Sequence, residues 1–201
     1  VEFDKVILIN SHDTTLYIYR GVSYDSVGSF QQAINDFNTT LQIDSTLIDV
    51  YIKRASIFSR LGKLNESIAD YDKALSIDSN FSVALNNKGL AYEILGKYNE
   101  AVFWYNKALH INKNEPDIFF NRGVSLLYLK EYEKALGDFN SAIELVQTNG
   151  LYYLNRGIAY YYLKLYDKAC KDWEEAKLLG NKEAAKYLES YCKQSSESLI
   201  V

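Results

Sequence analysis

Few side chains in this sequence could take part in catalysis or hold a metal ion. The 201 residues include two histidines, His12 and His110, and two cysteines, Cys170 and Cys192. Neither histidine has a cysteine or a second histidine at the spacing of a metal site. The sequence also has no glycine-rich phosphate loop and no nucleophile elbow. It therefore predicts no catalytic residue, no metal site, no cofactor and no enzymatic activity within these residues.

Charged side chains recur at a fixed spacing, which favours ion pairs with a structural role. A basic residue recurs every 34 residues, at Arg20, Arg54, Lys88, Arg122 and Arg156. Sixteen residues after each come Asp36, Asp70, Trp104, Asp138 and Asp172. Partly buried pairs of this kind fix geometry more than they add stability. Two pairings stay open: within one repeat, or to the preceding repeat, as between Asp36 and Arg54.

The same 34-residue period organises the chain into pairs of helices. Residues 82–115 have the pattern of two amphipathic helices joined by a tight turn at residues 96–99. Steps of 34 residues from Gly89 reach only small residues, namely Gly21, Ala55, Gly123 and Gly157. Large and aromatic residues at spacings of three, four and seven share one face of each helix. A fixed period in the range of about 20–50 residues is typical of a stacked array of repeats.

Five full repeats are predicted to follow one another without insertion, at 14–47, 48–81, 82–115, 116–149 and 150–183. Residues 1–13 match the end of a second helix, so we interpret them as the end of a truncated preceding repeat; a frayed tail is the alternative. Residues 184–201 begin like a further first helix that no second helix follows. They are predicted to form a terminal capping helix, which repeat arrays need for solubility, and a loose tail.

The large–small–aromatic pattern resembles the tetratricopeptide repeat family over nearly the whole chain. At the twenty-fourth place of each repeat, for example, stand Phe37, Tyr71, Tyr105, Phe139 and Trp173. The resemblance implies an all-α fold, a right-handed α-α superhelix or solenoid with a C-terminal capping helix. One departure concerns Lys130 and Lys164, which stand where earlier repeats have a glycine that can end the first helix in a left-handed conformation. These two turns are expected to be strained by about 1 kcal/mol each, or to close differently.

In this family the first helices line a concave groove that binds partner proteins. The resemblance then directs the second, fifth, sixth, ninth, twelfth and thirteenth residues of each repeat into the groove. In the fourth and fifth repeats these include Phe120, Leu127, Tyr128, Leu151, Leu154, Tyr161 and Tyr162. An exposed apolar surface of this kind marks a partner site. The alternative is that Phe120, Leu154 and the tyrosines pack between repeats as ordinary core.

Asparagines occupy the sixth place of three successive repeats, at Asn87, Asn121 and Asn155. An amide offers a donor and an acceptor, so a row of asparagines can hydrogen-bond an extended peptide backbone whatever its sequence. The row is similar to the asparagine ladder in the superhelical arm of O-linked N-acetylglucosamine transferases. Tyr19 and Lys53 break it in the first two repeats. Ordinary solvated asparagines on a helix surface are the alternative.

One activity of the family is not expected. Members that bind chaperones clamp a C-terminal carboxylate with lysine and asparagine at the fifth and ninth places of one repeat, and with further polar and basic residues in the next two. Here those two places hold Ile18 and Val22, Ile52 and Ser56, Asn86 and Leu90, Phe120 and Val124, and Leu154 and Ile158. No window supplies the clamp, so the acidic C-terminal tails of chaperones are not expected as partners.

The two cysteines have two interpretations. Aliphatic residues occupy the places of Cys170 and Cys192 in most other repeats, so Cys170 is most simply a small buried hydrophobic residue. The alternative is a disulfide between them, which would staple the capping segment to the fifth repeat. That bond would imply an oxidising compartment.

Composition argues against two kinds of partner. The chain is 48% hydrophobic with a formal net charge of −4, and it lacks the basic stripe of a nucleic-acid-binding protein. No apolar run approaches the roughly 18 residues of a membrane-spanning helix. The sequence contains no methionine, so we expect that the chain does not begin at its own initiator. The compartment stays open between the cytoplasm and export after removal of a leader.

The predicted function is a non-enzymatic scaffold that binds a protein or peptide partner in the concave groove. Two alternatives stay open. One is a substrate-recruiting arm of an enzyme whose catalytic domain is absent from these residues, and the other is an assembly protein that self-associates as a homo-oligomer. The array alone does not identify the partner, because a fold does not fix a function.

Overall fold

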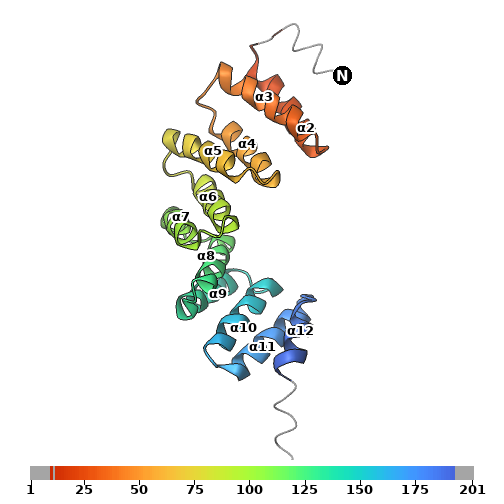
Figure 1. Ribbon diagram of the computed structural model, residues 1–201, viewed down its shortest axis with the longest axis vertical. Coiled ribbons are helices and arrows are strands. Elements are labelled where there is room, and N and C mark those ends of the chain that lie inside the picture. Colours follow the sequence, from red (N-terminus) through yellow and green to blue (C-terminus); the bar gives the residue numbers. More distant parts are fainter. Residues whose placement is uncertain (1–9, 11, 193–201) are drawn as a thin grey trace, which may run out of the picture. The chain divides into compact units, whose positions relative to one another are not determined.

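The computed structural model describes residue 10 and residues 12–192, and every regular element within them is an α-helix. The chain divides into two compact units, Val1–Leu95 and Gly96–Val201. The first unit contains α2 (Thr14–Ser26), α3 (Phe30–Ile43), α4 (Ile48–Arg60), α5 (Leu64–Ile77) and α6 (Ser82–Ile94) (Figure 1). The second contains α7 (Tyr98–Ile111), α8 (Pro116–Tyr128), α9 (Tyr132–Leu145), α10 (Gly150–Tyr162), α11 (Tyr166–Leu178) and α12 (Ala184–Tyr191).

Within each unit, helices pack mainly against their neighbours in the chain. In the first unit α2 pairs with α3 and α4 with α5, while α3 contacts α4 and α5 contacts α6. In the second unit α8 pairs with α9 and α10 with α11, and α7, α9 and α11 contact the helices that follow them. The helix α8 also contacts α10, so the first helices of successive pairs lie side by side. This sequential packing is what a repeat array requires.

The small residue at the eighth place of a repeat is required by an aromatic ring that lies against it. A Cβ atom added to Gly123 would lie 2.7 Å from a carbon of Phe139, and one added to Gly157 would lie 2.5 Å from the indole nitrogen of Trp173. Both residues are buried: the exposed fraction is 0% for Phe139 and 1% for Trp173. Interiors are packed too densely to absorb such a contact. The two helices of a pair therefore approach this closely because the first one lacks a side chain at the crossing.

The turns at Lys130 and Lys164 close in the same way as the glycine turns. Lys130 has a φ of 62° and Lys164 a φ of 61°, close to the 75° of Gly28. After Lys130, the N–H of Glu131 donates to the carbonyl of Leu126 at 2.9 Å, as the N–H of Ser29 donates to Tyr24 after Gly28. The lysine turns thus adopt the left-handed cap, which costs a residue with a Cβ atom about 1 kcal/mol.

Four arginines form the predicted ion pair within one repeat, so Asp36 pairs with Arg20 and Arg54 with Asp70. Arg20, Arg54, Arg122 and Arg156 each donate from Nε and Nη2 to the aspartate sixteen residues later, at 2.5–2.8 Å. Three of them also donate from Nη1 to an asparagine of the preceding repeat at 2.5–2.8 Å, in the pairs Arg54–Asn38, Arg122–Asn106 and Arg156–Asn140. Lys88 forms an ion pair with Asp72, also in the preceding repeat. Each of these three arginines therefore ties its own helix pair to the second helix of the preceding repeat.

Two predicted segments lie partly outside the described residues. Of the partial repeat at 1–13, the structure describes only residues 10, 12 and 13, and His12 is exposed. Of residues 184–201, it describes 184–192, which include α12. The division into a partial repeat, five full repeats and a capping segment stays a prediction.

Candidate functional site

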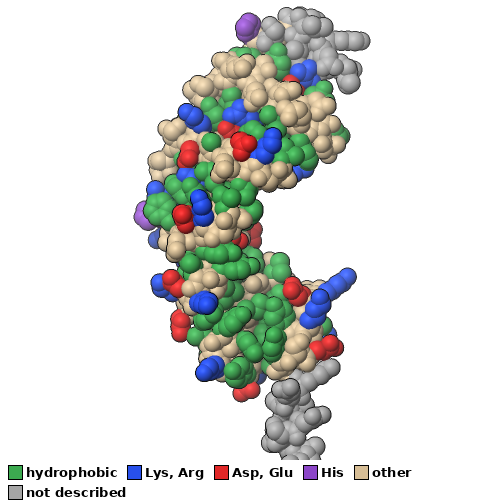
Figure 2. Space-filling model, in the orientation of Figure 1, with side chains coloured by type: hydrophobic (Ala, Val, Ile, Leu, Met, Phe, Trp, Pro, Cys, Tyr) green, Lys and Arg blue, Asp and Glu red, His purple; other side chains and the backbone are tan. Residues whose placement is uncertain are grey.

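An apolar hollow of about 220 Å3 lies between α8 and α10. It is lined by Val124, Leu127, Tyr128, Asn155, Ile158 and Tyr162. All six stand at places that the sequence directs into the groove, namely the ninth, twelfth and thirteenth of the fourth repeat and the sixth, ninth and thirteenth of the fifth. On the face of this unit seen in Figure 2, hydrophobic side chains gather over its middle and charged side chains lie around them.

Two half-exposed tyrosines form the walls of this hollow. Tyr128 is 62% exposed and Tyr162 is 56% exposed. Each ring is stacked on another tyrosine: Tyr128 on Tyr98 at 4.5 Å between centroids, and Tyr162 on Tyr132 at 4.8 Å, with the ring planes within 6° of parallel. Stacking of this kind adds to the stability that ring burial gives. The walls are therefore held in place by rings from the first residues of α7 and α9.

Tyr98 and Tyr132 were not among the predicted groove residues. They stand one repeat apart, at the seventeenth place of the third and fourth repeats. Tyr128 and Tyr162 are separated by the same interval. This matched pair of spacings is the signal in the sequence that could have identified the stacked rings.

Asn155 is the predicted asparagine that lines the hollow. Its Nδ2 donates to the carbonyl of Leu151 in the same helix at 2.9 Å. This bond fixes the orientation of the amide and leaves Oδ1 as the atom that can accept a hydrogen bond from a ligand N–H.

The other two predicted asparagines have different surroundings. Asn87 lies on α6 in the first unit, where it is a hydrogen-bonding neighbour of the buried phenol of Tyr71, together with Ser67 and Ser59. Burial raises the pKa of Tyr71, and these hydrogen bonds oppose the rise. Asn121 lies half-buried on α8. The asparagine row as a peptide-binding device stays a prediction.

Three of the predicted groove residues have packing contacts instead. The ring of Phe120 lies 5.1 Å from that of Tyr152 and 6.0 Å from that of Phe139. Leu154 is 3% exposed and belongs to a buried cluster with Ala169 and Trp173. Tyr161 contacts Tyr191 of α12 at 4.6 Å and Trp173 at 6.0 Å. Phe120 thus packs against the next repeat, Leu154 packs against α11 and the start of α12, and Tyr161 packs against the capping helix.

A second apolar hollow, of about 420 Å3, lies in the first unit. Its lining includes Ile18 of α2, residues 46–50 at the start of α4, Lys53 and Phe81. Unlike the hollow of α8 and α10, it has charged side chains in its lining, those of Asp49 and Lys53.

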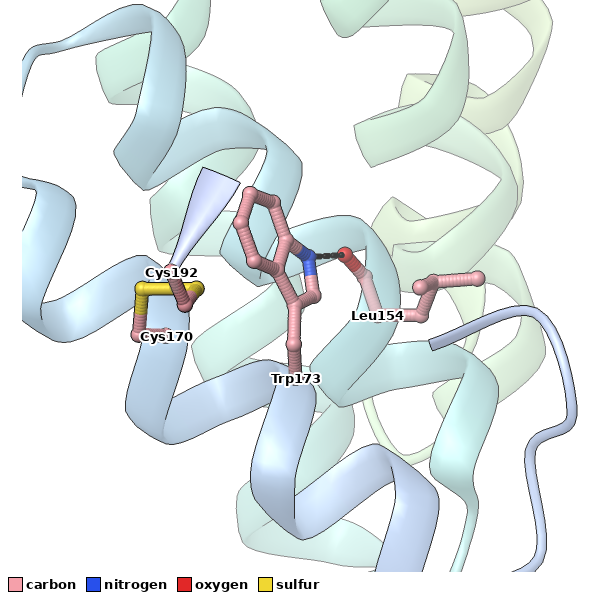
Figure 3. The surroundings of a disulfide bond; sticks show 4 residues. All are labelled: Leu154, Cys170, Trp173 and Cys192. Atoms are coloured by element: carbon pink, nitrogen blue, oxygen red, sulfur yellow. Dashed lines mark hydrogen bonds between the residues drawn. A yellow bond between two sulfur atoms is a disulfide. The ribbon is translucent and has the colours of Figure 1, made fainter. Parts of the chain in front are cut away.

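A disulfide joins Cys170 of α11 to Cys192 at the end of α12, with the Cα atoms 5.9 Å apart. Cys170 and Trp173 lie one helical turn apart on α11 (Figure 3). The indole Nε1 of Trp173 donates to the carbonyl of Leu154 on α10 at 3.2 Å. The structure thus contains the second of the two arrangements that the sequence left open for the cysteines.

Two absences hold for residue 10 and residues 12–192, the part of the chain that the structure describes. No group of three or more histidine, cysteine, aspartate or glutamate side chains there is arranged to hold a metal ion. None of the helices there has the length and apolar character needed to cross a membrane.

Comparison with known proteins identifies the repeat. A family model described as "Tetratricopeptide repeat" matches residues 82–115, and one described as "TPR repeat" matches residues 56–96. Residues 56–115 of the chain therefore match tetratricopeptide repeats. None of the curated proteins matches this chain in sequence.

Solved structures share its fold. A crystal structure of MamA is 23% identical and covers 86% of this chain and 94% of its own, with a TM-score of 0.77. YrrB, described as a TPR protein with an unusual peptide-binding site, is 21% identical and covers 93% of this chain and 97% of its own, with a TM-score of 0.77. MamA 41-end from Desulfovibrio magneticus RS-1 is 15% identical and covers 83% and 94%, with a TM-score of 0.78. At these identities the likeness concerns the fold, and it confirms the predicted all-α tetratricopeptide solenoid.

Proposed function

We propose that this chain is a non-enzymatic interaction scaffold that binds a peptide segment of a partner protein in the hollow between α8 and α10. The observation that carries the proposal is the pair of half-exposed tyrosines, Tyr128 and Tyr162, on either side of an apolar floor. Tyrosine is enriched at protein interfaces because it joins a large apolar ring to a polar tip. The description of YrrB as peptide-binding supports the same class of function.

The lining of the hollow indicates what kind of peptide it fits. Val124, Leu127 and Ile158 give an aliphatic floor, and no acidic or basic side chain is part of the lining. Burying an unpaired charge there would be costly. The volume of about 220 Å3 is below the range of about 300–1,000 Å3 that is usual for whole small molecules. The hollow therefore fits apolar side chains of a peptide better than a charged tail or a complete metabolite.

Asn155 gives the hollow one polar contact. Its amide is fixed by the hydrogen bond to Leu151, so Oδ1 needs no reorientation before it accepts a hydrogen bond. A backbone N–H of the bound peptide would satisfy it. Pockets of this type usually combine an apolar lining with a few placed polar groups that set the orientation of the ligand.

A peptide selection followed by affinity measurements tests the proposal. Peptides that bind the wild-type chain are selected from a displayed random library, synthesised with a fluorophore, and titrated by fluorescence anisotropy. The double variant Tyr128→Ala/Tyr162→Ala is expected to bind them at least tenfold more weakly, since each loss of about 1.4 kcal/mol from ring burial corresponds to a factor of ten.

The matched control is Phe103→Ala, which removes an aromatic ring that is also half exposed, on the second helix α7. It is expected to leave the affinity unchanged, because Phe103 is not part of the hollow. Equal affinity of the wild type and the tyrosine double variant would exclude this hollow as the binding site.

A further inference from the structure

The capping helix α12 is held at both of its ends. At its start, the Oδ1 of Asn181 accepts hydrogen bonds from the N–H groups of Glu183 and Ala184, at 2.9 and 3.1 Å. At its end, Cys192 follows the last helical residue and is bonded to Cys170 of α11. The helix has only eight residues. Isolated helices shorter than about 12–15 residues are marginal in water, so the position of α12 depends on its packing and on these two anchors.

The inner side of α12 covers an aromatic core. The ring of Trp173 lies 5.0 Å from that of Tyr187 and 5.9 Å from that of Tyr191. Trp173 is only 1% exposed. Tyr191, next to Cys192, also lies 4.6 Å from Tyr161. Loss of α12 would therefore expose the indole of Trp173 and the ring of Tyr161.

Tyr161 connects this covered surface to the candidate groove. Its ring meets that of Tyr162, a wall of the hollow, edge to face at 5.9 Å. The aromatic surface beneath the C-terminal turn of α12 is thus continuous with the exposed tyrosine wall.

The disulfide itself is open to reductants, because Cys170 and Cys192 are each partly exposed. A thiolate of an external dithiol can attack one sulfur and displace the other cysteine as a thiolate. The second thiol of the reagent then closes its own disulfide and releases the first cysteine. Two electrons and two protons pass from the dithiol to Cys170 and Cys192.

We propose that the Cys170–Cys192 bond is a redox lock on the capping helix. In the oxidised chain α12 is seated on α11 and covers Trp173 and Tyr161. In the chain reduced by a dithiol, the C-terminal turn of α12 leaves α11 and uncovers an aromatic surface that adjoins the wall of the hollow. The inference does not rest on the proposed peptide binding, because it concerns the contacts of α12 with α11 and α10 alone.

Fluorescence of Trp173 tests the lock. The sequence has two tryptophans, so the variant Trp104→Phe leaves Trp173 as the single reporter. Its quenching by acrylamide is measured in the oxidised protein and after dithiothreitol, with mass spectrometry to count the free thiols. Reduction is expected to raise the quenching constant several-fold and to shift the emission to longer wavelength.

The matched control adds Cys170→Ser and Cys192→Ser to the same variant. It is expected to show the high quenching constant with or without dithiothreitol. Quenching that stays at the oxidised value after complete reduction, or a serine variant that behaves like the oxidised protein, would overturn the proposal.

Hydrogen exchange separates the lock from a general loss of structure. After reduction, the amides of α12 are expected to lose protection while those of α10 and α11 keep it. Loss of protection across α10, α11 and α12 together would overturn the lock and assign the bond to the stability of the last helix pair. Neither result depends on whether a peptide binds between α8 and α10.

Discussion

At the thirteenth place of the fourth and fifth repeats, Tyr128 and Tyr162 are half exposed, yet each stacks on a second tyrosine. A ring fixed in this way has little freedom left to lose when a ligand packs against it. Since immobilised side chains cost about 0.5–1.5 kcal/mol each on binding, the stacked arrangement lowers that cost. Tyr98 and Tyr132 therefore support the candidate site without lining it.

In the arginine networks, the charged partners could be predicted from the sequence, but the asparagine partners could not. The spacing of Arg122 and Asp138 predicted an ion pair, and the structure shows one with two hydrogen bonds. The bond from Arg122 to Asn106 was not predicted, because an asparagine has no charge to mark it as a partner. Burial raises the pKa of Asp138 although Arg122 opposes the rise, so desolvation outweighs the attraction. Such a pair sets geometry more than it adds stability.

The left-handed lysines make a prediction at the scale of single residues. Lys130→Gly and Lys164→Gly are each expected to raise the free energy of unfolding by up to about 1 kcal/mol, because glycine avoids the Cβ clash at positive φ. The greater conformational entropy of glycine in the unfolded chain offsets part of this gain. The reverse exchange Gly28→Lys is expected to lower it. Urea denaturation measures all three, and a loss of stability in both lysine variants would contradict the account of these turns.

At the scale of the helix pair, the closest approach is set by a missing side chain. Gly123→Ala is expected to lower the free energy of unfolding by about 1–3 kcal/mol, because the new methyl group would collide with Phe139. The control is Gly137→Ala in α9, where a Cβ atom meets nothing within 4 Å. That variant is expected to gain about 0.5–1 kcal/mol from its better helix propensity. Similar urea midpoints for the two variants would show that the crossing tolerates a side chain.

The contact between α8 and α10 gives a prediction about pH. The hydroxyl of Tyr152 donates to Oδ1 of Asp117 at 2.7 Å. Burial raises the pKa of Tyr152 to about 12, and Asp117 adds to the rise. Because the folded chain keeps this proton to higher pH than the unfolded chain, the stability it contributes is complete below about pH 10 and is lost as the pH rises towards 12.

Tyr152→Phe isolates this effect from the titration of the other tyrosines. The difference in unfolding free energy between the wild type and the variant is expected to shrink between pH 10 and pH 12, as measured by urea denaturation at a series of pH values. A difference that stays constant over this range would show that Tyr152 ionises as it does in the unfolded chain.

At the scale of the whole molecule, the constant period of the sequence was enough to predict the all-α repeat fold, because each pair of helices buries the same face against its neighbours. It was not enough to separate exposed groove residues from core. Phe120 and Leu154 lie on the inward helix faces like Tyr128, but Phe120 packs against Tyr152 of the next repeat, and Leu154 is covered by α11 and α12. Tyr161 is covered because α12 follows the last pair. The exposure of a groove side chain therefore depends on which element follows its helix pair. A repeat pattern assigns all repeats the same surroundings and does not contain this information.

Methyl NMR tests the central claim most directly, because it compares the two apolar hollows in one experiment. A peptide selected on the wild-type chain is added to protein labelled at its valine, leucine and isoleucine methyl groups. The signals of Val124, Leu127 and Ile158 are expected to shift, while those of Ile18 and Ile48 in the first unit stay in place. Shifts confined to Ile18 and Ile48, with the methyl groups of α8 and α10 unchanged, would contradict the assignment of the binding site.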